Sequence, residues 1–395
     1  MTPRCTCTFL AVMLAAWVSS TRVAHAQTGG GEAGFESEGA EDPIDPTVAD
    51  RIHRGLEYLK AAQNSDGSFG PKGVGDQLEC RIGISALAGL AFLAGGNVPG
   101  RGKYGQQVER VLTYFLERAS TSSSGLLSDS HDSSKMHGHG YATLFLAEVY
   151  GMTIDPLARD RIAPAIRAAI KHIVDAQEDK LKDDALGEMG GWGYTQHDES
   201  HEGSITVCCL QALRAARDVG FKVPKHTLVK ALRYLIASQN TDGSFTYRLN
   251  HGQSHSTLPL TAAAISTFNA FGVYDDTTTR VLGEDMPQIP DCMRRGLGYI
   301  DSTAFNPAAL AEQLYYRRFF YYSEYYASQA YYKSRFPGRG RRWPQYYARV
   351  RRLLLERFDD TQGCWDDSEY GGAYATANAT LILQIPYRYL PIFQR

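Results

Sequence analysis

The sequence has 395 residues, a formal net charge of −2 and 43 % hydrophobic residues. This balance excludes a general electrostatic attraction to nucleic acid, and the length is sufficient for a large hydrophobic core. Five of the seven cysteines follow residue 26, and their odd number and irregular spacing exclude the disulfide framework of a small secreted domain. The spacing identifies no single disulfide pair.

Residues 1–26 have the pattern of an export signal. Arg4 supplies a positive flank, Phe9 to Val18 form an apolar core too short to span a bilayer, and Ala24-His25-Ala26 places small residues at the cleavage positions. We therefore predict cleavage before Gln27 and a secreted or periplasmic protein. A membrane anchor that is never cleaved is the alternative. No later segment is apolar over a sufficient length to cross a membrane.

The rest of the chain divides by composition into a linker and a helical domain. Residues 27–46 are acidic and rich in glycine, and they lack the apolar residues needed for a core, which predicts a flexible linker. Residues 47–395 show alternating helix and turn patterns with almost no strand signal, which predicts one all-α domain. The expected helices, taken in pairs, are 47–63 and 81–95, 106–119 and 141–150, 160–177 and 204–219, 226–239 and 257–271, 291–300 and 315–336, and 345–358 and 374–384.

One string occurs twice and sets the architecture. Gln63-Asn64-Ser65-Asp66-Gly67-Ser68-Phe69 returns as Gln239-Asn240-Thr241-Asp242-Gly243-Ser244-Phe245, each time after a helical pattern. Asn, Asp and Gly favour turns with left-handed backbone, so each copy predicts that a helix ends and the chain reverses. Turn glycines at 67, 125, 191, 243 and 363 mark five of six hairpins. We expect a closed ring with six outer and six inner helices, with an open superhelix as the alternative.

The repeated pattern resembles a known family. The order Arg54-Gly55, Tyr58-Leu59, Gln63 and Gly67-Ser68-Phe69 is similar to the QW repeat of squalene and oxidosqualene cyclases. The β subunits of protein prenyltransferases share that fold, the α/α toroid. Partial copies occur at Gly190-Gly191-Trp192 and Gln362-Gly363-Cys364-Trp365, so the resemblance covers nearly all of residues 47–390. It implies an (α/α)6 toroid with a central cavity, and fold does not by itself imply activity.

The reacting groups of these families are missing. The Asp-x-Asp-Asp motif with which the cyclases protonate an alkene does not occur. The prenyltransferase zinc ligands, Asp-x-Cys on one inner helix and a histidine on a later one, are also absent from the expected fifth and sixth inner helices. The Gly-Cys-Gly-Glu-Gln thioester signature of complement-type toroids does not occur either. Whether the chain is an enzyme therefore stays open at this point.

Histidines and one glutamate cluster ahead of three expected inner helices. The candidate binding residues are His137, His139, His197, His201, Glu202, His251 and His255. In a toroid these helix starts meet at one end of the cavity. Three interpretations remain: a metal site, with zinc held by His139, His201 and His255; a pocket for an anion or sugar; or simple caps of the helices.

The expected fifth hairpin is rich in tyrosine and arginine. Between residues 315 and 352, ten tyrosines alternate with ten basic residues, and Glu324 is the single acid. The functional interpretation is an aromatic and cationic wall for an anionic or glycan ligand, with Arg318 and Tyr322 as candidate contacts. The structural interpretation is that the tyrosines fill the core while the arginines stack on them from outside.

Together these patterns predict an exported toroid that binds a small-molecule, glycan or lipid-like ligand in its central cavity. The first alternative is a lyase or hydrolase of a cell-surface polymer that uses a His/Tyr site at the cavity mouth, with or without zinc. The second is a scaffold for protein interactions. The export signal argues against nucleic acid as a partner.

Overall fold

The computed structural model describes residues 45–70, 80–129, 132, 134–177, 189–198, 200–249, 256–336 and 342–394. The chain divides into two units, Met1–Pro43 and Ile44–Arg395, and all described residues belong to the second. The predicted signal peptide lies outside the described residues. Among the described residues, no helix is both long enough and apolar enough to cross a membrane.

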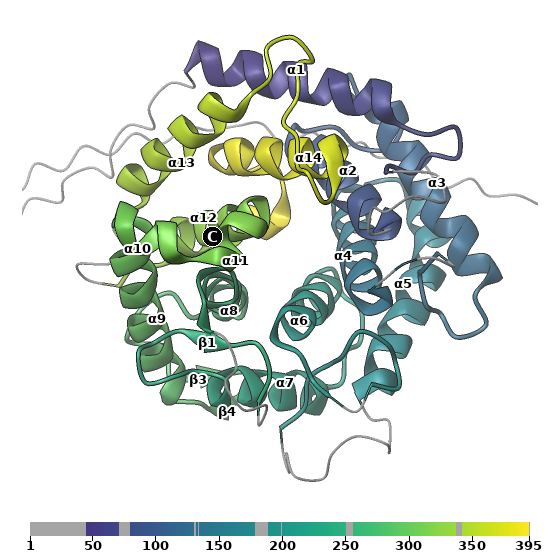
Figure 1. The fold of residues 1–395 in the computed structure, drawn as a ribbon. Helices are drawn as coiled ribbons and strands as arrows, with labels where there is room; N and C mark the ends of the chain where they lie inside the picture. Colours follow the sequence, from purple (N-terminus) through teal and green to yellow (C-terminus); the bar gives the residue numbers. More distant parts are fainter. Residues whose placement is uncertain are drawn as a thin grey trace, which may run out of the picture. The chain divides into compact units, whose positions relative to one another are not determined.

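Within the second unit, six outer helices surround six inner helices (Figure 1). The outer helices are α1 (Pro46–Ala62), α3 (Gly105–Thr121), α5 (Pro156–Gln177), α7 (Lys225–Ala237), α9 (Gln288–Ala304) and α13 (Trp343–Arg357). The inner helices are α2 (Arg81–Ala94), α4 (Lys135–Met152), α6 (Gly203–Asp218), α8 (Leu258–Ala270), α12 (Phe320–Lys333) and α14 (Gly371–Gln384). The predicted all-α toroid of six hairpins is thus confirmed, although some helix ends differ: α4 begins six residues before its expected start at 141.

Smaller elements lie in the connections. The fifth hairpin contains a short helix that the sequence did not indicate, α10 (Pro307–Glu312), and the helix expected at 315–336 is divided into α11 (Leu314–Arg318) and α12. Two antiparallel ribbons pair β1 (Phe245–Thr246) with β2 (Ser256–Thr257), and β3 (Arg280–Val281) with β4 (Glu284–Asp285). The 3₁₀ helices η2 (Ile385–Tyr387) and η3 (Pro391–Phe393) follow α14.

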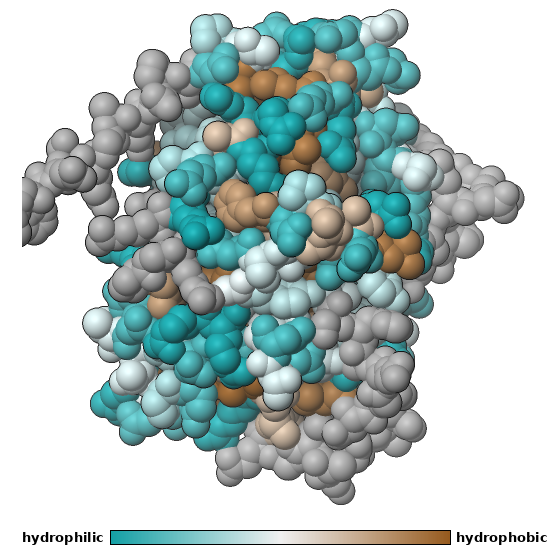
Figure 2. Space-filling view, turned by 60° about the vertical axis from the view of Figure 1, so that its left-hand side comes forward, coloured by the Kyte–Doolittle hydropathy of each residue, from teal (hydrophilic) through white to brown (hydrophobic). Residues whose placement is uncertain are grey.

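The two rings differ in how much of each helix is buried. In α1 the buried residues Val48, Ile52, Leu56 and Leu59 recur at helical spacing on one face, as expected for a helix with one side in solvent. In α2 every residue from Ile82 to Ala94 is buried. The outer polar faces make the side seen in Figure 2 mostly hydrophilic, with hydrophobic residues in small separate patches.

Small residues let the inner helices pack closely. A Cβ atom at Gly140 of α4 would lie 2.6 Å from the Sγ atom of Cys208 on α6. At Gly89 of α2 it would lie 2.5 Å from the Phe145 ring on α4. Each inner helix contacts the next, and α14 returns to pack on both α1 and α2. The ring is therefore closed, and the alternative of an open superhelix is wrong.

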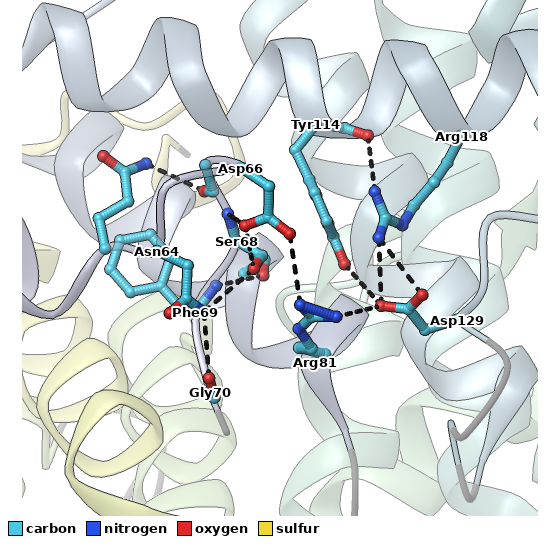
Figure 3. Close-up of polar contacts among 12 residues, drawn as sticks. Asn64, Asp66, Ser68, Phe69, Gly70, Arg81, Tyr114, Arg118 and Asp129 are labelled. Atoms are coloured by element: carbon cyan, nitrogen blue, oxygen red, sulfur yellow. Dashed lines mark hydrogen bonds and ion pairs between the residues drawn. The ribbon is translucent and has the colours of Figure 1, made fainter. Parts of the chain in front are cut away.

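The duplicated turn joins neighbouring hairpins through its glutamine. The Nε2 atom of Gln63 donates to the Gly67 carbonyl of its own turn (3.0 Å) and to the Gln107 carbonyl of the next outer helix (3.1 Å). Gln239 makes the equivalent bonds to Gly243 and Cys292. Within the first turn, the Asp66 carboxylate accepts hydrogen bonds from the backbone and hydroxyl of Ser68 (Figure 3). The repeated string therefore fixes both the turn and the spacing between hairpins.

The chain ends at one mouth of the ring. The backbone N–H of Ile392 donates to Oε2 of Glu148 on α4 (3.2 Å), and its carbonyl accepts from the ammonium group of Lys333 on α12. Helices α4 and α12 lie on opposite sides of the inner ring (Figure 1). The segment around Ile392 therefore crosses the end of the ring where α4 and α12 terminate.

Candidate functional site

A cavity of about 680 Å³ lies at the opposite mouth of the ring, where the inner helices begin. All six inner helices contribute to its wall near their first turns: Gly83, His137, Ser204, Leu260, Tyr322 and Tyr374 come from α2, α4, α6, α8, α12 and α14 in that order. The volume falls within the range of about 300–1,000 Å³ typical of small-molecule sites. The closed ring thus forms the pocket from residues far apart in the sequence.

Tyrosines make up much of this wall. Those lining the cavity are Tyr141, Tyr194, Tyr247, Tyr315, Tyr322, Tyr370 and Tyr374. The hydroxyl of Tyr141 lies 3.1 Å from that of Tyr326, whereas the buried hydroxyl of Tyr322 has no hydrogen-bond partner among the described residues. Burial raises the pKa of Tyr141 and Tyr322 well above 10, so both stay neutral phenols that can donate hydrogen bonds.

Two arginines reach the cavity. Arg318 forms a two-point ion pair with Glu369, with Nε–Oε2 and Nη2–Oε1 distances of 2.9 and 2.6 Å. The Arg248 guanidinium lies over the Tyr247 ring, 5.4 Å from its centroid. Because a carboxylate already neutralises Arg318, the wall is less cationic than the run of arginines in the sequence suggests.

Asp132 is the single carboxylic acid among the described residues that line the cavity, and it was not among the predicted site residues. Its Oδ2 atom accepts a hydrogen bond from the Asp129 backbone N–H (2.8 Å), and its Oδ1 atom makes no hydrogen bond of normal geometry with the described residues. Burial raises the pKa of Asp132 to about 6, although the backbone N–H groups of Asp129 and Ile82 act in the opposite direction. The available signal was a pair of carboxylates three residues apart just before an inner helix.

A polar network around Asp129, shown in Figure 3, fixes the loop that also carries Asp132. The Asp129 carboxylate accepts hydrogen bonds from Arg81 (3.0 Å), Arg118 (3.2 Å) and the Tyr114 hydroxyl (3.1 Å). Arg81 also pairs with Asp66 of the duplicated turn (3.3 Å). The backbone position of Asp129, and with it the bond to Asp132, is therefore held from helices α2 and α3.

The structure gives the first two predicted histidines different roles. His137 lines the cavity; its Nδ1 atom lies 3.0 Å from the Ser134 hydroxyl, and burial lowers its pKa to about 4. His139 is fully buried toward the outer ring. Its Nδ1 atom accepts from the Leu127 backbone N–H (3.0 Å) and its Nε2 atom donates to the Ala169 carbonyl of α5 (3.1 Å). Both residues lie within α4, not before it as expected.

His139 takes the place of a hydroxyl residue found in other hairpins. The backbone N–H of Phe69 donates to Ser85, and that of Phe245 donates to Thr261. Leu127 is the equivalent turn residue two positions after a turn glycine, and its N–H donates to His139. With both ring nitrogens in backbone hydrogen bonds, His139 does not fit a role as a metal ligand.

The remaining candidates belong to the third hairpin or lie outside the described residues. His201 Nδ1 accepts from the Gly191 backbone N–H (2.9 Å), and Glu202 caps α6 by accepting from the backbone N–H groups of residues 204 and 205. Burial raises the pKa of Glu202 to about 7. His197 is exposed and does not line the cavity. His251 and His255 lie outside the described residues.

The hydrogen bonds of these histidines argue against the predicted zinc site. Among the described residues, no three His, Cys, Asp or Glu side chains are arranged to hold a metal ion. His139 and the Nδ1 atom of His201 serve backbone groups, so the donor atoms of this pair do not fit the predicted zinc set.

Most tyrosines of the fifth hairpin pack within the fold. Glu324 is buried and accepts hydrogen bonds from the hydroxyls of Tyr316 (2.5 Å) and Tyr346 (2.7 Å) and from Arg349 (3.0 Å). Tyr331 stacks on Tyr346 with ring centroids 4.2 Å apart. The structural interpretation therefore applies to these residues, whereas the predicted contacts Arg318 and Tyr322 do line the cavity.

Comparisons with known proteins extend the fold assignment. The chain matches no family model, and no curated protein is similar to it in sequence. An inactive variant of the α-1,6-mannanase GH76A of Salegentibacter sp. HEL1_6, in complex with α-1,6-mannotriose, is similar in structure with a TM-score of 0.62 and 11% identity, covering 85% of this chain and 98% of that one. The type II terpene cyclase MstE from Scytonema has a TM-score of 0.51 and 13% identity, covering 87% and 99%. A variant of MstE in complex with geranylgeranyl dihydroxybenzoate has a TM-score of 0.50 and 13% identity, covering 88% and 98%. The chain is an all-α protein with the α/α-toroid fold that these glycan- and terpene-binding proteins share.

Proposed function

We propose that the protein binds a neutral carbohydrate chain in the central cavity of the toroid. The observation that carries this proposal is the wall of seven tyrosines around about 680 Å³. Phenol rings offer flat apolar faces on which sugar rings stack, and their hydroxyls offer hydrogen bonds to sugar hydroxyls. The pairing of Arg318 with Glu369 favours a ligand without net charge.

Polar atoms in the wall favour a carbohydrate over a hydrocarbon ligand. The Tyr322 hydroxyl and the Asp132 Oδ1 atom are buried without well-formed hydrogen bonds among the described residues. An isoprenoid offers these groups no hydrogen bond, so its binding would gain nothing from them. Sugar hydroxyls would supply the missing partners. The mannanase found in complex with α-1,6-mannotriose supports this choice by analogy of fold.

Calorimetric titration tests the proposal. The probes are α-1,6-mannotriose, a panel of other neutral oligosaccharides, and geranylgeraniol as the isoprenoid. We expect a neutral oligosaccharide to bind, and Tyr322→Phe to weaken it about tenfold, the value of one hydrogen bond. Tyr150→Phe, outside the cavity, serves as the control and should bind normally. Binding of geranylgeraniol with no oligosaccharide binding would refute the proposal.

Export belongs to the same proposal. A cleavable signal at residues 1–26 would deliver the protein to the compartment where extended carbohydrate chains are exposed. Mass spectrometry of the protein recovered outside the cytoplasm should give an N-terminus at Gln27. An uncut N-terminus would contradict the proposed signal peptide. The binding proposal would be unaffected, because the titration tests it separately.

A further inference from the structure

Asp132 is positioned in a way that packing alone does not require. It is 7 % exposed, and one carboxylate oxygen is fixed by the Asp129 backbone N–H at 2.8 Å. The residue lines the cavity, and its other oxygen is buried without a hydrogen bond of normal geometry among the described residues, although the Ile82 backbone N–H also acts on the carboxylate. One oxygen is therefore anchored, while the other lacks a well-formed hydrogen bond.

The anchor of Asp132 is itself rigid. Asp129 is bound through its carboxylate to Arg81, Arg118 and Tyr114, so its backbone N–H is held by two helices (Figure 3). Functional groups held by a second layer of hydrogen bonds keep the geometry that catalysis needs. A surface carboxylate that happened to lie near the cavity would have no such support.

We propose that Asp132 is the general acid of a glycoside hydrolase reaction in the central cavity. This inference rests on the carbohydrate ligand proposed above. The carboxyl proton of Asp132 passes to the glycosidic oxygen while the bond from that oxygen to the anomeric carbon breaks, which releases one sugar as an alcohol. Water then adds to the anomeric carbon, and a proton from that water returns to the carboxylate. The net change is the addition of one water molecule across the glycosidic bond.

The surroundings of Asp132 favour its protonated form. Burial is the largest influence and raises its pKa to about 6; the negative charge of Asp129 acts in the same direction, and Arg118 opposes it. The other charged or titratable groups nearby are Arg81, which is paired with Asp129, and His137, whose pKa burial lowers to about 4. Around pH 5 the carboxyl group therefore carries its proton while His137 is neutral. A general acid needs its proton at the working pH.

The test uses the full chain and an oligosaccharide that binds in the titration, beginning with α-1,6-mannotriose. New reducing ends are measured between pH 4 and 8. We expect hydrolysis by the wild type that declines above about pH 6, and a loss of at least about 100-fold in Asp132→Asn with binding retained. Asp175→Asn, which replaces an exposed aspartate on α5, should keep the wild-type rate.

The outcomes separate this inference from the proposed function. An oligosaccharide that binds but is not hydrolysed at any pH would overturn the general acid and leave carbohydrate binding intact. Hydrolysis by Asp132→Asn at the wild-type rate would likewise overturn the general acid and leave carbohydrate binding intact. Should that variant lose binding through misfolding, the pH–rate profile of the wild type still decides, because a rate that does not fall above pH 6 contradicts the role of Asp132. If no oligosaccharide binds at all, the proposed carbohydrate binding is refuted together with this inference.

Discussion

Replacing Asp132 by asparagine should make the protein more stable at neutral pH but not at acid pH. The usual pKa of this side chain is 3.8, and burial raises it to about 6 in the folded protein. Between these two values the folded state holds a proton that the unfolded state has released. The free energy of unfolding therefore falls as pH rises through this window. About two pKa units at 1.36 kcal/mol each correspond to about 3 kcal/mol.

Asparagine removes this penalty, because it keeps the shape and the acceptor for the Asp129 N–H but carries no charge. We expect the difference in unfolding free energy between Asp132→Asn and wild type to shift by about 2.5 kcal/mol in favour of the variant from pH 4 to pH 7.5, because a small part of the effect is already present at pH 4. Urea unfolding followed by circular dichroism at four pH values measures this difference. Asp175→Asn, at an exposed aspartate, is the control. A difference that stays constant across this range would refute a buried, protonated Asp132.

Three further predictions concern the scaffold. Gly243→Ala should cost about 3 kcal/mol of stability, because the backbone has φ = +90° and the new Cβ would lie 2.5 Å from the Arg295 carbonyl. The control Gly220→Ala, at φ = +98° with open space around the new Cβ, should cost only about 1–2 kcal/mol. Equal losses of stability in urea unfolding would contradict the role of the close approach at Gly243. Gln239→Leu should cost about 2–4 kcal/mol, because it leaves two backbone carbonyls without their donor, and a thermal midpoint like that of wild type would show that they find other partners. Chelation with EDTA should leave the thermal midpoint unchanged, because both ring nitrogens of His139 serve the backbone; a marked decrease would restore the metal interpretation.

The fold was predictable because its signals are local. Helix periodicity and the string from Gln63 to Phe69 act within about twenty residues, so the pairing of helices and the turns could be inferred from sequence alone. The closed ring followed from six units of similar length. Helix α10 was missed because the fifth turn lacks the glycine that marks the others.

The site was predictable only in part, because its wall comes from every hairpin. Tyr322 and Arg318 were expected from a conspicuous local cluster. Asp132 was marked only by a second carboxylate three residues away, Asp129, and its significance depends on burial and on the network around Asp129, which the sequence does not show. For His139 the local pattern was present but had another cause. A histidine ahead of an expected helix suggests a binding residue or metal ligand, but here it replaces the serine or threonine that accepts a turn N–H in other hairpins.

The crossing of Ile392 over the far mouth has a consequence for any polymer that enters. The backbone N–H and carbonyl of Ile392, bound to Glu148 and Lys333, place this segment across the mouth opposite the cavity. A carbohydrate chain bound as proposed above would meet this segment at the far mouth, so we expect the cavity to receive a chain end in preference to an internal stretch.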